Sequence, residues 1–149
     1  MKNKELVLET LKRSGRLAAE SVQLHAADMT GTELNAEVDY IPDFNAACKK
    51  MNMLSRKIGF VCKSSAGRVV KLLQNYNSDV FTQEPEELPA QWGFVWSKDP
   101  AHALPFAAIS TSPYMAGDCC TENGGTFRSR QDNNVHAPSA YPQGWEAVE

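Results

Sequence analysis

The sequence predicts a mainly β fold, made of two tandem small modules of a β-hairpin with a third strand, preceded by an α-helical region. Three observations predict it. The spacing Pro-x-x-x-Pro-x-x-Trp-x-x-Val occurs twice, turns rich in glycine and asparagine separate short strand-like runs, and the N-terminal part shows helical periodicity. The expected division is a helical attachment or oligomerisation region at 1–50, a first module at 56–98 and a second module at 112–149.

The N-terminal region is expected to contain three helical segments. The first, 4–13, has Leu6, Val7, Leu8 and Leu11 as its apolar side and ends in two basic residues that suit the negative end of a helix. The second, 16–27, has Leu17, Val22 and Leu24 as its apolar positions. Thr30 and Glu33 match a capping box, which predicts a third helix from Gly31 to about Val38. A lone helix cannot hide this much apolar surface, so the sequence predicts a homo-oligomer joined through residues 1–40.

The internal repeat organises the remainder of the chain. The aligned pairs are Gly59 with Gly117, Cys62 with Cys120, Gly67 with Gly124, Gln74 with Gln131, Asn77 with Asn134, Pro85 with Pro138, Pro89 with Pro142, Trp92 with Trp145 and Val95 with Val148. Each copy predicts a first strand entered through a glycine, a tight turn, a second strand and an irregular proline loop. That loop would bring one tryptophan against the hairpin, so Trp92 and Trp145 are expected to close the two cores.

Composition excludes several classes of partner and chemistry. A net charge of −3 and scattered basic residues argue against binding of nucleic acid. No apolar run is long enough to serve as a secretory signal or to span a membrane, so the chain is expected to be made in the host cytoplasm. The four cysteines lack C-x-x-C spacing, which favours buried free thiols over a metal site. No cofactor and no catalytic residue is expected, because the histidines are isolated and the acidic residues cluster in one loop.

The second copy resembles a known family of binding modules. The run from Tyr114 to Val148 has the form Y-x-x-G-D-x-C-x-x-x-G-x-x-F-R-S-x-x-D-N-N-x-x-x-P-x-x-x-P-x-x-W-x-x-V. This pattern is similar to the chitin-binding type 3 module, also grouped as carbohydrate-binding module families five and twelve. The chain as a whole resembles small prophage proteins of Firmicutes, which share the segments 29–34 and 41–44 and end in paired modules of this kind.

The resemblance implies a non-catalytic, carbohydrate-binding accessory protein of a phage particle, placed on a tail or head fibre. Its expected partners are a polysaccharide or cell-wall glycan, bound weakly, and other virion proteins; its expected location is the virion, extracellular after release. The alternative is a purely structural fibre or decoration protein that binds virion proteins without glycan. A third possibility, the detached domain of a secreted glycanase, is weakened by the missing signal peptide.

The candidate ligand-binding residues are Tyr76, Trp96, Arg128, Arg130 and Tyr141. Members of the family stack exposed rings on sugars near the end of the second strand, where this chain has glutamine, aspartate and asparagine. Tyr76 and Tyr141 are therefore the rings expected to be exposed, while Trp96 either packs between the modules or offers a further exposed ring. Arg128 and Arg130 are expected to contact an acidic glycan or a protein, unless they simply form a solvated face.

Overall fold

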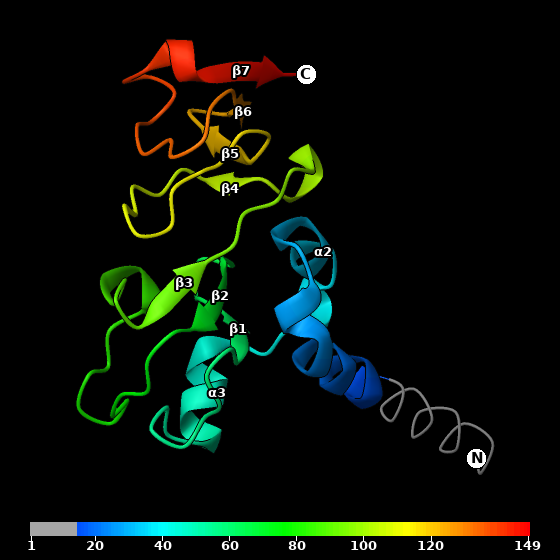
Figure 1. Ribbon diagram of the computed structural model, residues 1–149, viewed down its shortest axis with the longest axis vertical. Coiled ribbons are helices and arrows are strands. Elements are labelled where there is room, and N and C mark those ends of the chain that lie inside the picture. Colours follow the sequence, from blue (N-terminus) through cyan, green and yellow to red (C-terminus); the bar gives the residue numbers. More distant parts are fainter. Residues whose placement is uncertain (1–14) are drawn as a thin grey trace, which may run out of the picture.

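The computed structural model describes residues 15–149, and its N-terminal part is helical (Figure 1). Residues 15–25 form a helix, which is followed by the short 3-10 turn η1 (Ala26–Asp28), α2 (Gly31–Ala36), η2 (Val38–Tyr40) and α3 (Phe44–Lys50). The capping box is confirmed, because Thr30 accepts a hydrogen bond from the Glu33 amide and the Glu33 carboxylate accepts one from the Thr30 amide. The helix expected at 4–13 lies outside the described residues.

Two small sheets make up the remainder of the fold. The first contains β1 (Val61–Lys63), β2 (Val69–Leu72) and β3 (Trp92–Phe94), all antiparallel. The second contains β4 (Leu104–Pro105), β5 (Cys119–Glu122), β6 (Gly125–Ser129) and β7 (Trp145–Val148), with β4 parallel to β5 and the other pairs antiparallel. Short 3-10 turns, η3 (Pro85–Glu87), η4 (Pro100–His102) and η5 (Pro142–Gly144), lie in the connections. The predicted order of helices before sheets is confirmed, although the fold is mixed α and β and not mainly β.

The first helix packs differently from the expectation. Val22 is buried, but Leu17 is 58% exposed and Leu24 is 78% exposed. Successive helical residues are separated by about 100°, so positions 17 and 24 lie on the side of the helix opposite position 22. Val22 and Ala26 face the protein, so the three apolar positions expected for this amphipathic segment do not lie on one side of the helix.

The same helix closes the outer side of β1. The Gln23 side-chain amide donates to the Val61 carbonyl oxygen at 2.7 Å, and the Val61 amide donates to the Gln23 side-chain oxygen at 3.0 Å. Beyond Val61, the Lys63 amide donates to the carbonyl oxygen of Pro42 at 2.9 Å. These bonds satisfy backbone groups of β1, which is the edge strand of its sheet in the part of the chain that the structure describes.

The two sheets share a hydrogen-bond pattern. The Gly59 amide donates to Leu72 at 2.8 Å, and the Gly117 amide donates to Ser129 at 2.9 Å; both glycines have φ above +90°. Leu72 is paired with Trp92 across β2 and β3, just as Ser129 is paired with Trp145 across β6 and β7. The sequence placed both tryptophans in closing loops, but each begins the last strand of its sheet, β3 for Trp92 and β7 for Trp145.

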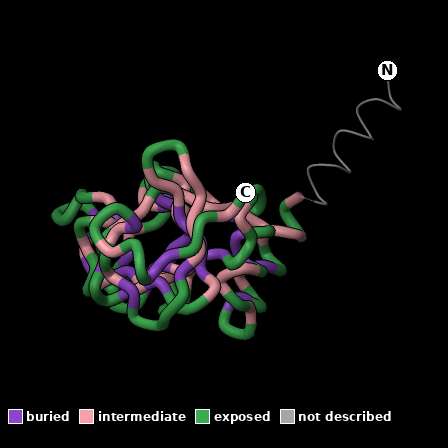
Figure 2. The backbone as a smooth tube through the Cα atoms, turned by 90° about the horizontal axis from the view of Figure 1, so that it is seen from above, coloured by how far each residue is buried: buried purple, intermediate pink, exposed green. Residues whose placement is uncertain are grey.

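One hydrophobic core joins the two sheets. Figure 2 shows the buried segments of the chain running through its interior, with exposed segments around them. Tyr114 lies between two other rings, with centroids 4.3 Å from Trp96 and 5.3 Å from Phe106. The rings of Phe94 and Trp96 are stacked in turn, at 5.8 Å. Trp145 meets Tyr114 edge to face at 5.4 Å, so the aromatic cluster runs from β3 to β7 without interruption.

The opposite face of the first sheet packs against the helices. Val61 and Val69 are buried there with four residues of the helical region, Val22, Ala26, Leu34 and Ile41. Alternation along β2 explains this arrangement, because Val69 faces the helices while Val70 and Leu72 face the aromatic core. β2 therefore has buried residues on both of its faces.

Polar contacts also join the sheets. Arg68 forms a 2.9 Å ion pair with Glu86, and its second terminal nitrogen donates to the Pro105 carbonyl of β4 at 2.9 Å. Ser64 donates to the same carboxylate at 2.8 Å. Because the Arg68 and Glu86 side chains are only 12% and 22% exposed, this ion pair is shielded from solvent more than a surface pair is.

The cysteines are free thiols, as expected. Cys62, Cys119 and Cys120 are buried and Cys48 is half-buried. Burial raises the pKa of all four, that of Cys120 to about 12, so the thiols stay protonated at neutral pH.

Candidate functional site

Two of the three candidate rings are buried. Tyr76 is only 7% exposed and its hydroxyl oxygen accepts a 3.0 Å hydrogen bond from the Trp92 indole. Burial raises the pKa of Tyr76 to about 12. Trp96 is 8% exposed, stacks on Tyr114, and donates to the Ser112 carbonyl at 2.9 Å. The expectation that Tyr76 is exposed is wrong, and of the two placements open for Trp96, packing between the sheets is the correct one.

The other three candidates remain accessible but are not brought together. Tyr141 is half-buried, with its ring against Gly144 and 5.9 Å from the ring of His136. Arg128 is half-buried on β6 and lies opposite Glu146 in the register of β6 and β7. Arg130 is exposed just beyond β6. Among the described residues, no hydrogen bond or ring contact connects Tyr141 with either arginine.

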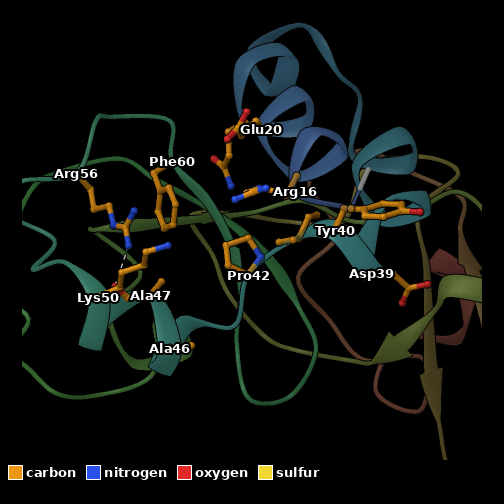
Figure 3. A pocket seen from close by; sticks show the side chains of 14 residues that line it. Arg16, Glu20, Asp39, Tyr40, Pro42, Ala46, Ala47, Lys50, Arg56 and Phe60 are labelled. Atoms are coloured by element: carbon orange, nitrogen blue, oxygen red, sulfur yellow. Dashed lines mark hydrogen bonds between the residues drawn. The ribbon is translucent and has the colours of Figure 1, made fainter. Parts of the chain in front are cut away.

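A hollow of about 790 Å³ lies elsewhere, between the helix at 15–25, the η2 turn and α3 (Figure 3). We call it the helix groove. Its floor is apolar and is formed by Ile41, Pro42, Ala47 and Phe60. The volume is within the range of about 300–1,000 Å³ typical of small-molecule sites in proteins.

Arg56 is a cation of the groove that two contacts hold in place. Its guanidinium carbon lies 4.3 Å from the centre of the Phe60 ring, and a terminal nitrogen donates to the Ala47 carbonyl at 2.9 Å. Figure 3 shows the side chains of Arg56 and Phe60 next to each other at one side of the helix groove. The Nε atom of Arg56 is buried and has no hydrogen-bond partner. The Arg56 guanidinium is held by the Phe60 ring and by the Ala47 carbonyl, and it has further N–H groups that can donate hydrogen bonds. It is therefore suited to binding an anion.

Further charged groups line the helix groove. Arg16 and Glu20 come from the helix at 15–25, Asp39 from η2 and Lys50 from the last turn of α3. Arg16, Lys50 and Arg56 form no ion pair within 4.0 Å in the part of the chain that the structure describes. Tyr40, 43% exposed, adds an accessible ring. The groove therefore combines an apolar floor with an excess of unpaired cations.

Reasoning from the sequence missed this groove because its walls come from three separate segments. One local signal was present. Residues 49–57 contain four basic residues, Lys49, Lys50, Arg56 and Lys57, and no acidic one. A run of this kind marks a basic surface, although it does not indicate that the chain folds a pocket beside it.

No group of three metal-ligating side chains lies together in residues 15–149. Over the same range, every helix falls short of the length and apolarity required to cross a bilayer. Comparison of the chain with protein families, with curated proteins and with solved structures found no match.

Proposed function

We propose that this chain is a non-catalytic structural protein that assembles with copies of itself and with other proteins, as an accessory component of a phage particle. The observation that carries the proposal is the pair of leucines, Leu17 and Leu24, exposed on a helix whose other side is docked on the protein. Leucines seven residues apart form one stripe, which is the pattern through which helices associate. The burial of Tyr76 and Trp96 adds support, because it removes two of the rings that glycan adhesion would need.

We further propose that the two sheets are copies of one duplicated module, resembling the chitin-binding type 3 module. Matching hydrogen bonds support this. The Glu87 amide donates to Glu84 at 2.9 Å where the Ala140 amide donates to Ala137 at 3.0 Å. In the same register, Gln91 donates to Leu88 and Gly144 donates to Tyr141, each at 3.1 Å. The sequence alignment and the backbone therefore agree over the proline loops as well as over the strands.

A second apolar surface supports contact with partner proteins. Of the ten exposed large apolar residues within 15–149, six lie on the segments 51–58 and 73–81, namely Met51, Leu54, Ile58, Leu73, Val80 and Phe81. Hydrogen bonds join the two segments, including one of 2.9 Å from the Asn75 side chain to the Met53 carbonyl. Concentrated exposure of this kind is typical of interaction surfaces, and a component of an assembly needs more than one.

The proposal predicts that the full chain is an oligomer and that the double variant Leu17→Lys, Leu24→Lys is a monomer. Two lysines in the leucine stripe would repel their counterparts and would remove the apolar area that drives association. Light scattering on both proteins measures the masses. Point variants test this better than a chain that starts near Asn52, because deleting the preceding residues would also remove Phe44 and Ala47 from the core.

The matched control is Leu54→Lys, Ile58→Lys, which adds the same charges to the second apolar surface. It should keep the oligomeric mass, and circular dichroism should show that all three proteins are folded. A native chain that is monomeric at tens of micromolar would overturn the proposal, as would an oligomer that survives the lysines on the helix.

Weak adhesion to bacterial surface glycans is the second candidate function, and the accessibility of Tyr141 favours it. With Tyr76 and Trp96 in the core, Tyr141 is the remaining aromatic candidate. We expect Tyr141→Ala to abolish retention of the oligomer on chitin or host cell walls, and Tyr141→Phe to preserve it, since stacking requires the ring. Retention that is unchanged by Tyr141→Ala would exclude this ring as a glycan contact and would leave Arg128 and Arg130 as the candidates to test.

A further inference from the structure

We propose that the helix groove is a binding site for an acidic saccharide, with Arg56 contacting the carboxylate and Tyr40 offering a ring to the sugar face. This site is separate from the leucine stripe and from Tyr141, so its test is independent of both proposed functions. It uses residues from the helix at 15–25, η2, α3 and the segment before β1.

Charge selects an anionic ligand. Arg16, Lys50 and Arg56 outnumber the two carboxylates of the groove, Glu20 and Asp39. Arg56 is held on Phe60 by a 4.3 Å contact and by its bond to Ala47, so little conformational freedom would be lost when it meets an anion. A guanidinium can bind a carboxylate with two parallel hydrogen bonds, which makes an acidic group a well-matched partner for Arg56.

Shape selects a compact ligand and not a peptide segment. An extended peptide adds to a sheet through a free strand, but Gln23 and Pro42 already occupy the outer side of β1. A helical peptide needs an apolar groove several turns long, whereas about 790 Å³ is the scale of a small molecule. The groove therefore fits one or a few sugar units better than it fits a protein chain.

The remaining lining residues suit a hydroxyl-rich molecule. Lys50 and Arg16 supply hydrogen-bond donors and the carboxyl groups of Glu20 and Asp39 supply acceptors, so both kinds of partner for sugar hydroxyls are present. Tyr40 is 43% exposed and gives an apolar face together with a polar hydroxyl. A purely anionic ligand without hydroxyl groups would be repelled by the two carboxylates of the groove and would donate no hydrogen bond to them.

The test compares D-glucuronate with D-glucose, which differ in the carboxylate, by chemical-shift titration of the full chain. We expect glucuronate to bind weakly and to perturb the resonances of Tyr40 and Phe60, and glucose to bind at least about tenfold more weakly. Arg56→Gln should weaken glucuronate binding by about tenfold and remove the preference over glucose. Arg56→Lys should restore part of it, because the charge remains while the paired geometry is lost.

Lys50→Gln gives a second test on an exposed residue, in case Arg56→Gln fails to fold, and we expect it to weaken glucuronate binding several-fold. Arg130→Gln is the matched control on the other sheet and should change nothing. Equal binding of the two sugars, or shifts confined to residues outside the groove, would overturn the proposal. A tri-glutamate peptide that bound more tightly than glucuronate at the same residues would also overturn it, in favour of an acidic protein partner.

Discussion

Replacing Trp92 with alanine is expected to lower the free energy of unfolding by about 3–5 kcal/mol. Trp92 is fully buried, its ring meets Phe44 and Tyr76 edge to face at 5.7 and 6.2 Å, and its indole nitrogen donates to the Tyr76 hydroxyl. The substitution would leave a cavity among side chains from α3, β2 and the proline loop. Urea denaturation followed by far-ultraviolet circular dichroism measures the change.

Trp145→Ala is expected to have an effect of similar size, because Trp145 is 4% exposed and packs on Tyr114 and Phe106. Since both tryptophans belong to one core, each substitution should shift a single transition of the whole protein and should not melt one sheet alone. Leu54→Ala, at an exposed position, is the control and should cost less than about 0.5 kcal/mol. A Trp92→Ala protein with the native midpoint would contradict the assignment of this ring to the core.

The stability of the protein is expected to fall as the pH rises from about 9 to about 12. Burial raises the pKa of Tyr76 and of Cys120 to about 12, and it also raises the pKa of Cys62 and of Tyr114. In the unfolded chain, thiols and phenols lose their protons near their ordinary pKa values of about 8.5 and 10. Above those values the unfolded state binds fewer protons than the folded state, so alkaline conditions favour unfolding.

Urea denaturation at several pH values between 7 and 12 measures this loss. Stability due to the buried phenols should be complete below about pH 10 and should decline toward pH 12. Tyr76→Phe has one titrating group fewer, so its curve should be flatter in that range when each protein is compared with its own value at pH 8. A native protein that is as stable at pH 11 as at pH 8 would show that these groups are not buried as described.

The parts of the fold that follow from local pattern could be predicted from the sequence. The capping box at Thr30 and the positive-φ turn glycines depend on neighbouring residues, and they occur as expected. The burial of Trp92 and Trp145 followed from their fixed spacing to two prolines in both copies. This inference was possible because the spacing occurs twice, and the same spacing in both copies indicates that both tryptophans pack in the same way.

The exposure of individual rings could not be predicted in the same way. Tyr76 is buried because it packs around Trp92 together with Phe44. Phe44 lies on a helix that the sequence pattern did not predict. Trp96 is buried by Tyr114, which lies later in the chain, in the segment between β4 and β5. The helix groove was unpredictable for the same physical reason, since tertiary packing of separate segments creates it.

The two hydrogen bonds between Gln23 and Val61 also bear on aggregation. An uncovered edge strand exposes backbone donors and acceptors that pair readily with another chain, and natural proteins protect such edges. Without the helix, β1 would present Val61 and Cys62 beside the apolar β2, a short sequence with strong β propensity. Gln23 occupies that edge with one side-chain amide that imitates a neighbouring peptide group. The helix that exposes Leu17 and Leu24 on its outer side therefore blocks, on its inner side, disordered growth through strand pairing.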